Sequence, residues 1–359
     1  MPGPVLAHLP TRLEPADRLG AALGLPPGRL WVKRDDCTGL ATGGNKARKL
    51  ELLVADARAR GCDVLVTAGG PQSNHARMTA AAAARAGMGC VLAFNSDRPG
   101  RTESNQVLEV LFGAERRFLG PLAMADLDAA VERIADELRG DGRGPYVIPI
   151  GGSSPLGASA YAAAADEILA DLGHDDLLVI TATGTGGTQA GLAARLGHER
   201  VLGIDVGALV DPVAAVRRLA IEVAALRGLP APVGEPRVGR DQVGDGYSAV
   251  TDACIGAIRL AARTEALLLD PVYSGKAMAG LMALPRSELR ATAIVFLATG
   301  GVPALFETRF ADSLVTPTGR LPFDVDPPST AIWGGEGKPL EGGRRVMAVR
   351  RTWHPAKRT

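Results

Sequence analysis

The sequence predicts an α/β protein with two three-layer domains, each built around a parallel sheet, and three observations support this prediction. Short apolar runs alternate with stretches of helical periodicity along most of the chain, which is the pattern of repeated β-α units. The runs are almost continuously apolar, as expected of parallel strands that helices cover on both faces. The 359 residues also exceed what one hydrophobic core usually holds, so two domains are expected.

The predicted elements follow one another in the order that β-α units require. Runs rich in Val, Ile and Leu indicate strands, and apolar residues three or four positions apart, such as Leu50, Leu53 and Ala57, indicate helices. The predicted strands are residues 30–33, 64–67, 90–94, 115–118, 146–150, 177–181, 201–205 and 293–298. The predicted helices are residues 46–60, 73–87, 102–111, 126–138, 156–172, 189–196, 213–227 and 249–264.

Composition and charge argue against several classes of protein. Hydrophobic residues make up 46% of the chain and charged residues 22%, as in ordinary soluble globular proteins. The net charge of +1 argues against nucleic acid or an anionic membrane as a partner. No apolar run reaches the length of a membrane span, and the first ten residues lack the layout of a signal peptide, so we expect a cytoplasmic protein.

The cysteines indicate neither a metal site nor a disulfide framework. They lie far apart in the sequence and form no C-x-x-C pair. We therefore expect all four to be buried reduced thiols: Cys37, Cys62, Cys90 and Cys254.

Lys46 occupies a position where a structural lysine is uncommon. It follows Gly43-Gly44-Asn45, in which two glycines permit a tight turn and Asn45 is a good helix cap. Lys46 is thus predicted in the first turn of a helix, at the positive end of the helix dipole, where a charged amine is disfavoured. An uncharged amine suited to Schiff-base chemistry fits this position, and a surface lysine at the end of a loop is the alternative.

A glycine-rich loop between a predicted strand and a predicted helix is a candidate phosphate site. The run Gly184-Thr185-Gly186-Gly187-Thr188 exposes backbone N–H groups at a helix N-terminus, which together bind anions. The loop lacks the Gly-Lys-Ser/Thr of a P-loop, and Gln189 stands where the dinucleotide fingerprint requires glycine. It therefore favours the single phosphate of a mononucleotide or a small cofactor, and a tight turn without a ligand is the alternative.

Three other segments carry polar side chains at turns. Gln72-Ser73-Asn74-His75 opens a helix directly after a strand, where α/β proteins place ligands, although Ser73 and Asn74 are also good helix caps. The other two are hydroxyl-bearing turns, Asp270-Pro271-Val272-Tyr273-Ser274-Gly275-Lys276 and Ala298-Thr299-Gly300-Gly301-Val302-Pro303. Each segment taken singly is a weak signal.

Taken together, these segments resemble pyridoxal 5′-phosphate enzymes of fold type II, the tryptophan-synthase-β-like group, and more narrowly the 1-aminocyclopropane-1-carboxylate deaminase/D-cysteine desulfhydrase family. The resemblance covers about residues 30–307, and its motifs occur in family order. Besides the segments above, it is carried by Lys33-Arg34-Asp35-Asp36, Arg48-Lys49-Leu50-Glu51, Tyr146-Val147-Ile148-Pro149 and Gly151-Gly152-Ser153. It implies a homodimer, with a small domain of residues 49–157 inserted into a large cofactor-binding domain of residues 1–48 and 158–308.

The resemblance also implies roles for individual residues. Lys46 would hold the cofactor as a Schiff base and would then remove the substrate's α-proton. Ser73, Asn74 and His75 would bind the substrate, with Ser73 holding its carboxylate or assisting proton transfer, and Asn74 would also bond the cofactor's ring hydroxyl. The pocket would be completed by the phosphate-binding residues Gly184, Thr185, Gly186, Gly187 and Thr188 and by the catalytic tyrosines Tyr273 and Tyr247.

Two positions distinguish the candidate reactions. Deaminases of the family have a glutamate after the Asp-Pro-Val-Tyr motif and a leucine at the second position, whereas this chain has Ser274 and Thr299, which would contact the cofactor. A neutral hydroxyl does not support a protonated pyridine nitrogen as a carboxylate does, so the ring becomes a weaker electron sink. This favours prompt loss of a good β leaving group, and D-cysteine would give pyruvate, ammonia and hydrogen sulfide.

Other functions stay open at this point. An L-cysteate sulfo-lyase would expel sulfite, and a cation near the leaving group would favour it, with Arg48, Arg77 and Lys276 as candidates. A 1-aminocyclopropane-1-carboxylate deaminase is the second alternative, and a non-catalytic protein that binds pyridoxal phosphate is the alternative of a different class. Residues 309–359, rich in Gly, Pro and Arg, are expected to form a disordered or loosely packed tail.

Overall fold

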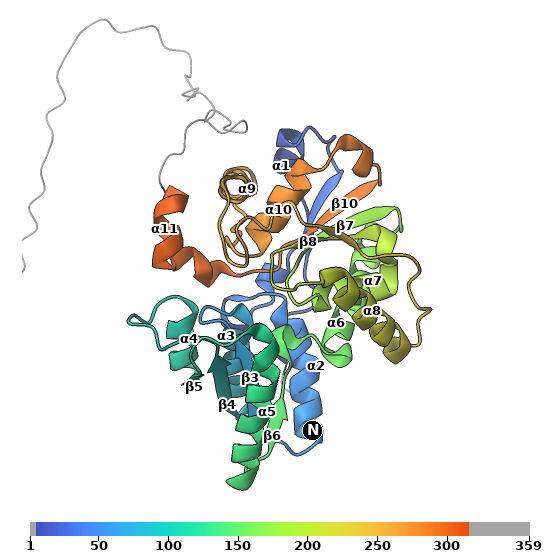
Figure 1. Ribbon diagram of the computed structural model, residues 1–359. Helices are drawn as coiled ribbons and strands as arrows, with labels where there is room; N and C mark the ends of the chain where they lie inside the picture. Colours follow the sequence, from blue (N-terminus) through green and yellow to red (C-terminus); the bar gives the residue numbers. More distant parts are fainter. Residues whose placement is uncertain (1–4, 316–359) are drawn as a thin grey trace, which may run out of the picture. The chain divides into compact units, whose positions relative to one another are not determined.

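The computed structural model describes residues 5–315, apart from the side chains of Met124 and Ala125, and its strands form two sheets (Figure 1). The six-stranded sheet has the order β1-β2-β10-β7-β8-β9, and the four-stranded sheet has the order β5-β4-β3-β6. The strands are β1 Leu13–Pro15, β2 Leu30–Lys33, β3 Val64–Gly69, β4 Gly89–Phe94, β5 Glu115–Phe118, β6 Pro145–Val147, β7 Leu177–Thr183, β8 Val201–Asp205, β9 Arg237–Gly239 and β10 Ala293–Leu297. All described strand pairs are parallel except β1 with β2.

Helices flank both sheets. They are α1 Asp17–Ala22, α2 Lys46–Ala59, α3 Asn74–Ala86, α4 Asn105–Leu111, α5 Met124–Gly140, α6 Pro155–Leu172, α7 Gly187–Leu196, α8 Pro212–Arg227, α9 Asp252–Glu265, α10 Ser274–Ala283 and α11 Thr308–Val315. Figure 1 shows α9 and α10 on one side of the six-stranded sheet and α6, α7 and α8 on the other.

The register of the larger sheet explains why it is apolar on both faces. Phe296 of β10 lies opposite Val32 of β2 and Ile180 of β7, and this row packs with α1, α9 and α10 in one core. The neighbouring residues Val295 and Val179 point the other way and pack with α6, α7 and α8 in a second core. Since successive side chains of a strand alternate between faces, a sheet covered on both sides requires continuously apolar strands.

The smaller sheet is built in the same way. Val66 of β3, with Val91 of β4 beside it, faces α5, whereas Leu65 faces the core made with α2 and α3. The chain passes from β1 and β2 to the whole four-stranded sheet and then returns to complete the six-stranded one. The predicted α/β fold class with helix-covered parallel sheets is confirmed, and the domain boundaries at residues 49 and 157 stay a prediction.

Some elements differ from the prediction. The sequence pattern missed β1, α1 and β9, which are each at most six residues long, and it predicted a longer β6. It also described residues 270–276 as a turn, but α10 begins at Ser274. The buried Asp270 carboxylate supports this start, because it accepts from the N–H groups of Val272, Tyr273 and Ser274 at 2.9, 2.9 and 2.8 Å. A side-chain acceptor at this place satisfies donors that have no partner within the helix.

The predicted C-terminal tail and the predicted thiols also need correction. The tail was expected from Arg309, but Thr308–Val315 form α11 with Phe310 buried, and residues 316–359 lie outside the described residues. All four cysteines are free, as expected, yet only Cys90 and Cys254 are buried. Cys37 is exposed because it ends a short 3-10 turn at the surface, and Cys62 is half-buried.

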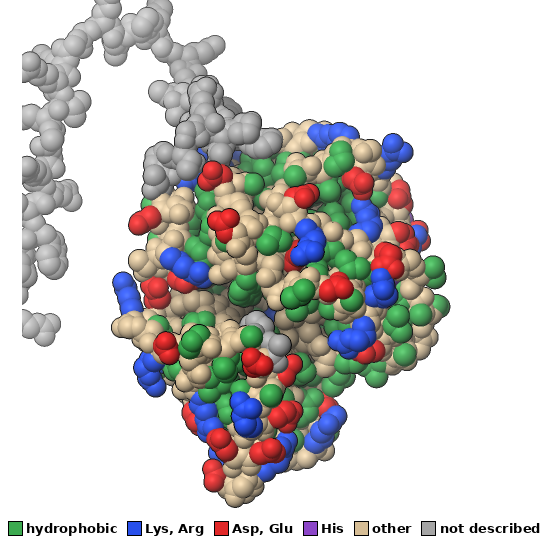
Figure 2. Space-filling view, viewed as in Figure 1, with side chains coloured by type: hydrophobic (Ala, Val, Ile, Leu, Met, Phe, Trp, Pro, Cys, Tyr) green, Lys and Arg blue, Asp and Glu red, His purple; other side chains and the backbone are tan. Residues whose placement is uncertain are grey.

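The surface carries charges of both signs. On the face shown in Figure 2, Lys and Arg side chains lie among Asp and Glu side chains without a large field of one sign. No helix among the described residues is long and apolar enough to cross a membrane.

Candidate active site

A cavity of about 520 Å³ collects most of the predicted site residues. It lies where β3, β7 and β10 end, which is the usual position of ligand sites in open parallel sheets. The predicted residues in its lining are Lys46, Ser73, Asn74, His75, Gly184, Thr185, Gly186, Gly187, Thr188, Tyr247, Tyr273 and Thr299. Ser274, which was predicted to contact the cofactor, does not line it.

The loop before α2 places Lys46 at the cavity. Gly43 has a φ of 77°, and a Cβ there would lie 1.9 Å from the backbone oxygen of Asp36, so only glycine fits. Lys46 then begins α2, as predicted, and its Nζ donates to Asn45 Oδ1 at 3.1 Å. The capping role expected of Asn45 is wrong, because its side chain makes no cap bond and instead donates from Nδ2 to Thr188 Oγ1 at 3.0 Å.

The surroundings of Lys46 favour its uncharged amine. Burial, and next the positive charge of Arg77, lower the pKa of Lys46 to about 8, whereas the Asp270 carboxylate opposes this shift. An amine with this pKa is partly deprotonated near neutral pH, which suits a nucleophile or a base.

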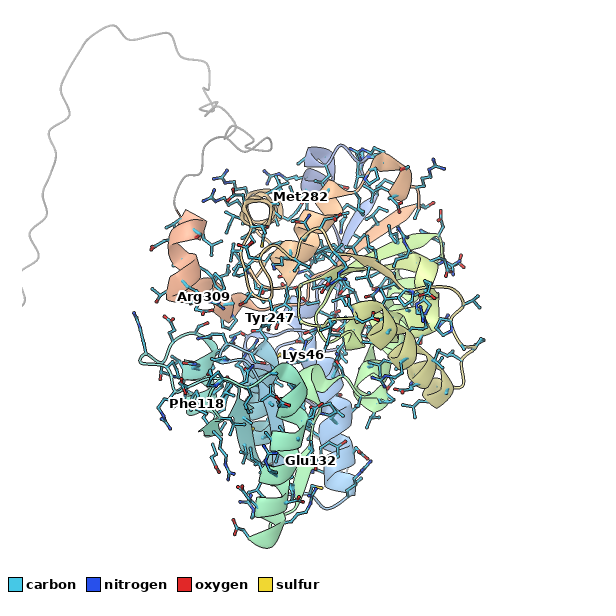
Figure 3. All side chains as sticks on the ribbon, viewed as in Figure 1. Lys46, Phe118, Glu132, Tyr247, Met282 and Arg309 are labelled. Carbon is cyan, nitrogen blue, oxygen red and sulfur yellow. The ribbon has the colours of Figure 1, made fainter. Side chains whose placement is uncertain are left out.

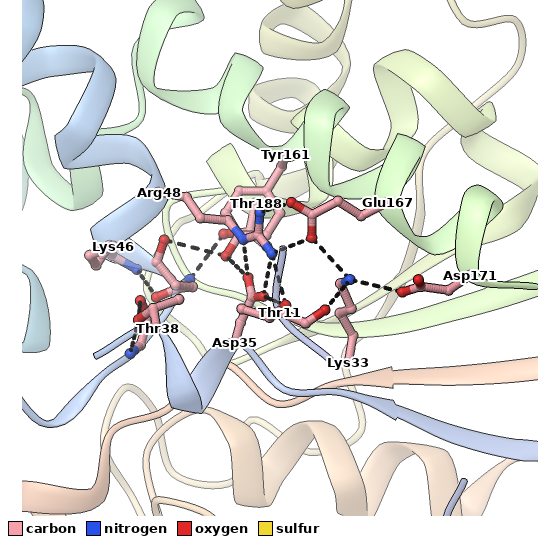
Figure 4. A network of polar contacts seen from close by, with 12 residues as sticks. Thr11, Lys33, Asp35, Thr38, Lys46, Arg48, Tyr161, Glu167, Asp171 and Thr188 are labelled. Atoms are coloured by element: carbon pink, nitrogen blue, oxygen red, sulfur yellow. Dashed lines mark hydrogen bonds and ion pairs between the residues drawn. The ribbon is translucent and has the colours of Figure 1, made fainter. Parts of the chain in front are cut away.

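A buried network of polar side chains lies next to Lys46 (Figure 4). Arg48 donates to both Asp35 oxygens at 2.9 Å and pairs with Glu167 at 2.7 Å. The Tyr161 hydroxyl donates to Asp35 Oδ2 at 2.6 Å and to the backbone oxygen of Asn45 at 3.3 Å. Because the members of this network bind one another, it restrains the backbone of Asn45. The Asn45 side chain in turn contacts the Lys46 amine and Thr188.

The glycine loop has the form of an anion cradle. Gly186 adopts a left-handed conformation with φ of 82°, and α7 starts at the next residue. A Cβ on Gly187 would lie 2.5 Å from Ser153 Oγ and 2.7 Å from Lys49 Nζ, so a side chain there would fill the space in front of the helix. Free N–H groups at a helix start together with a cation are the usual components of a phosphate site.

Lys49 is a functional candidate that the sequence argument did not single out. It is 1% exposed, lines the cavity, and donates to the backbone oxygen of Gly151 at 3.2 Å. Burial and the neighbouring Lys46 lower the pKa of Lys49 well below its usual value, and no carboxylate pairs with it among the described residues. Its spacing of three residues from Lys46, which places both on one helix face, could have indicated it.

The segment 72–75 supplies hydrogen-bonding groups from the start of α3. Ser73 caps this helix by accepting from Ala76 N at 3.2 Å, so the alternative capping interpretation also holds, while Ser73 still lines the cavity. Asn74 Oδ1 accepts from Asn105 Nδ2 at 3.0 Å. His75 Nε2 bonds Thr67 Oγ1 at 2.9 Å, and burial lowers the pKa of His75 far enough to keep the ring neutral.

Tyr247 and Tyr273 both line the cavity. Their hydroxyls are hydrogen-bonded to each other, and burial raises the pKa of both Tyr273 and Tyr247, so both stay protonated at neutral pH. In the view of Figure 3, Tyr247, which is 43% exposed, lies between Lys46 and Arg309.

Ser274 is buried and does not line the cavity. Its hydroxyl donates to Asp270 Oδ1 at 2.6 Å and accepts from Asp270 N at 2.8 Å, so the polar side chain is committed to the start of α10. Thr299, at the end of β10, does line the cavity. Of the two predicted discriminating residues, therefore, Thr299 is the one that presents itself to a ligand.

The three cations named for a sulfonate lie outside the lining of the cavity. Arg48 is bound to Asp35 and Glu167, Lys276 donates to the backbone oxygen of Val243 at 2.7 Å, and Arg77 is fully buried behind the loop before Lys46. Arg309 and Glu307 line the cavity instead and pair at 2.5 Å, and the sequence argument missed both because they follow the last recognised motif.

Comparisons with known proteins identify the family of the chain. A family model described as "Pyridoxal-phosphate dependent enzyme" matches residues 5–300. A D-cysteine desulfhydrase of Salmonella schwarzengrund (strain CVM19633) is 40% identical over 315 residues, 84% of this chain and 94% of that protein. A Pyrococcus abyssi (strain GE5 / Orsay) protein provisionally named 1-aminocyclopropane-1-carboxylate deaminase is 38% identical over 304 residues, 82% of this chain and 90% of that protein. A crystal structure of an ACC deaminase homologue superposes with a TM-score of 0.80 at 34% identity, covering 88% of this chain and 95% of that one.

The fold and the family model define a pyridoxal-phosphate-dependent enzyme, and pyridoxal 5′-phosphate is its cofactor. The chain belongs to the family of 1-aminocyclopropane-1-carboxylate deaminases and D-cysteine desulfhydrases. The described residues fit this cofactor, because a glycine cradle and an unpaired buried amine, Lys49, match its phosphate and Lys46 offers an amine for its aldehyde.

Proposed function

We propose that the protein is a lyase that converts D-cysteine and water to pyruvate, ammonia and hydrogen sulfide. The observation that carries this proposal is the side chain at the end of β10, where Thr299 offers a neutral hydroxyl to the cavity. Among the described lining residues, Glu307 is the only acid. It lies directly before α11. Ser274 stands where the family's deaminases have a glutamate, and both Ser274 and Thr299 carry neutral hydroxyls, so neither would give the nitrogen of a bound cofactor a carboxylate partner. This favours prompt expulsion of a leaving group over a long-lived carbanion.

The residues have separate tasks in this reaction. The bound cofactor supplies the electron sink that makes the substrate's α-proton acidic. We infer that Lys46 binds the cofactor's aldehyde and that its amine takes the proton from the α-carbon. Because the pKa of Lys46 is about 8, a fraction of this amine is uncharged near neutral pH. Ser73 would hold the substrate's carboxylate at the start of α3, where the helix dipole also favours an anion, and Asn74 would donate to the cofactor's ring hydroxyl.

The tyrosine pair would protonate the leaving sulfur. When the carbon-sulfur bond breaks, the sulfur departs with the bonding electrons and needs a proton to leave as hydrogen sulfide. Tyr273 and Tyr247 stay protonated at neutral pH and are hydrogen-bonded to each other, so a proton given by one can be replaced through the other.

The charges near the cavity favour a thiol over the sulfonate of L-cysteate. Arg309 is the cation that could attract a sulfonate, but Glu307 pairs with it at 2.5 Å. Glu307 Oε2 is buried without a hydrogen-bond partner in the described part of the chain, so it can accept from a thiol and would repel a second anion.

The direct test is turnover of three substrates by the purified holoenzyme, assayed separately. Pyruvate with sulfide from D-cysteine supports the proposal, whereas 2-oxobutyrate from 1-aminocyclopropane-1-carboxylate, or sulfite from L-cysteate as the main activity, contradicts it. The variant Lys46→Ala should lower turnover of D-cysteine by roughly a thousandfold, since it removes both the covalent anchor and the base.

The role of Glu307 is tested by Glu307→Gln. This variant should raise turnover of L-cysteate relative to D-cysteine by about tenfold, because it leaves Arg309 unpaired beside the cavity. Glu103→Gln is the matched control, since Glu103 accepts from Thr308 nearby but does not line the cavity. If the ratio of L-cysteate turnover to D-cysteine turnover is unchanged in Glu307→Gln, Glu307 does not determine the specificity. A homodimer and a cytoplasmic location stay predictions.

A further inference from the structure

Arg77 is a fully buried arginine on α3, three residues after Asn74, and it has no role in the proposed chemistry. Its guanidinium reaches two parts of the site at once. One side contacts the loop before Lys46, and the other side contacts the Asn74 amide and Asn105.

The loop that Arg77 contacts is held in an unfavourable backbone conformation. Ala41 and Thr42 have φ angles of 45° and 73°, which residues with a side chain rarely adopt. Arg77 Nη1 donates to the backbone oxygen of Ala41, to Thr42 Oγ1 at 3.2 Å and to the backbone oxygen of Gly43 at 3.4 Å. Such conformations persist only where the surroundings fix them, and here the fixed loop leads directly into Lys46.

Arg77 also fixes which way the Asn74 amide points. Asn74 Oδ1 accepts from Arg77 Nη2 at 3.3 Å and from Asn105 Nδ2 at 3.0 Å, while Arg77 Nε donates to Asn105 Oδ1 at 3.1 Å. Asn105 is itself anchored, since its Nδ2 donates to the backbone oxygen of Gln72 at 2.8 Å. With the oxygen of Asn74 occupied by two donors, its NH₂ group is left to donate to a ligand in the cavity.

We propose that Arg77 is a positioning residue of the cofactor site, which holds the loop before Lys46 and orients the Asn74 amide so that its NH₂ group donates to the cofactor's ring oxygen. This inference rests on the proposed roles of Lys46 and Asn74. Arg77 acts through these two residues and does not touch the substrate or the cofactor.

The charge of Arg77 gives it a second effect on Lys46. The charged and titratable groups around Lys46 are Arg77 and His75 on α3, Lys49 on α2, and Asp270 before α10. His75 is neutral and Lys49 has a lowered pKa, so Arg77 is the main fixed positive charge that disfavours a protonated Lys46. Burial lowers the pKa of Arg77 itself to about 10, which still leaves it charged at pH 8, and Glu109 opposes this shift.

The charge effect is measured on apoenzyme, without turnover. Lys46 is labelled with a small amine-reactive reagent over a range of pH, and the modified peptide is quantified by mass spectrometry. Arg77→Gln should move the midpoint of Lys46 labelling up by about one pH unit, whereas Arg77→Lys, which keeps the charge, should stay near the wild type. If the midpoint of Lys46 labelling does not move in Arg77→Gln, the charge of Arg77 does not influence Lys46 and this effect is refuted.

The positioning effect is measured as the dissociation constant of pyridoxal 5′-phosphate. Arg77→Lys and Asn105→Ala should each weaken binding by about tenfold, because each removes a donor that orients Asn74. Arg85→Gln, an exposed change on the same helix, should bind as the wild type does. If Arg77→Lys does not fold, Asn105→Ala still tests the orientation of Asn74.

A double-mutant cycle separates positioning from general loss of structure. In the background of Asn74→Ala, Asn105→Ala should cause little further loss of affinity, since the amide that it orients is gone. Additive losses overturn the proposal. Failure of the proposed D-cysteine reaction is seen separately, as wild-type enzyme that binds cofactor but makes no sulfide, and it leaves both measurements intact.

Discussion

At the scale of single residues, the site depends on two lysines of α2 whose environments differ in one respect. Lys46 has the Asn45 oxygen and the distant Asp270 charge to support a proton. Among the described residues, Lys49 has a backbone oxygen and the face of the Tyr161 ring but no carboxylate. Lys49 therefore has the stronger need for an anionic ligand, and the phosphate of the cofactor would provide it. In the proposed site, Lys46 would hold the aldehyde and Lys49 would hold the phosphate.

We expect Lys49→Gln to raise the dissociation constant of pyridoxal 5′-phosphate by at least about tenfold, because it removes a charge-assisted bond to the phosphate. Equilibrium dialysis of the apoenzyme measures this. Lys33→Gln is the matched control, since Lys33 is equally buried but pairs with Glu167 at 2.9 Å and does not line the cavity. Equal losses in both variants would mean that Lys49 acts through stability rather than through the phosphate.

The sequence located residues of the site better than it assigned their contacts. Lys46, Asn74 and the glycine loop were found because each belongs to a motif at the junction of a strand or loop with a helix. The orientation of Ser274 and Asn45 could not be found in this way, because it depends on Asp270 and Thr188, which are close in space and not given by a local pattern.

At the scale of elements, α4 carries a buried acid that the sequence did not reveal. Glu109 has no exposed surface, and neither of its carboxylate oxygens has a hydrogen-bond partner among the described residues. Burial raises the pKa of Glu109 to about 8, with Arg116 and Arg77 opposing the shift. The folded protein therefore binds a proton here that the unfolded chain releases at lower pH.

Because the folded pKa lies above the unfolded one, the stabilising effect of this proton is full below about pH 4.5 and is lost as the pH rises to about 8. The free energy of unfolding should thus fall between pH 5 and pH 8, and Glu109→Gln should remove about 4 kcal/mol of that fall. Urea denaturation of both proteins at several pH values measures this. Parallel pH profiles for the two proteins would show that Glu109 titrates normally.

Helix α11 extends the described fold beyond the last recognised motif. Phe310 is 3% exposed, and Arg259 of α9 donates to the backbone oxygen of Ser313 at 3.1 Å. The hydrophobic pattern of eight residues is too short to stand out in a segment rich in polar residues, so the sequence predicted a tail from residue 309.

Phe310→Ala should lower the free energy of unfolding by about 3 kcal/mol, since it empties a buried aromatic site. Thermal or denaturant unfolding checks this, with Phe306→Ala as the control because Phe306 is 72% exposed. A loss no greater than that of the control would mean that α11 is not part of the stable fold.

At the scale of the whole described chain, the order of the strands brings distant motifs to one cavity. The chain forms the whole four-stranded sheet, β3–β6, before it returns to the six-stranded sheet with β7–β10. The apolar strand pattern was sufficient to predict this class of fold, because parallel strands covered on both faces leave a strong signal. It could not predict strand order, since the motifs carry no information on which strand pairs with which.

We propose that the cavity performs β-elimination on D-cysteine. The most direct measurement compares kcat/KM of the holoenzyme for D-cysteine and for 1-aminocyclopropane-1-carboxylate under identical conditions, with pyruvate, sulfide and 2-oxobutyrate quantified. We predict equal amounts of pyruvate and sulfide from D-cysteine and no 2-oxobutyrate. Efficient formation of 2-oxobutyrate from the cyclopropane substrate, with no sulfide from D-cysteine, would contradict the claim.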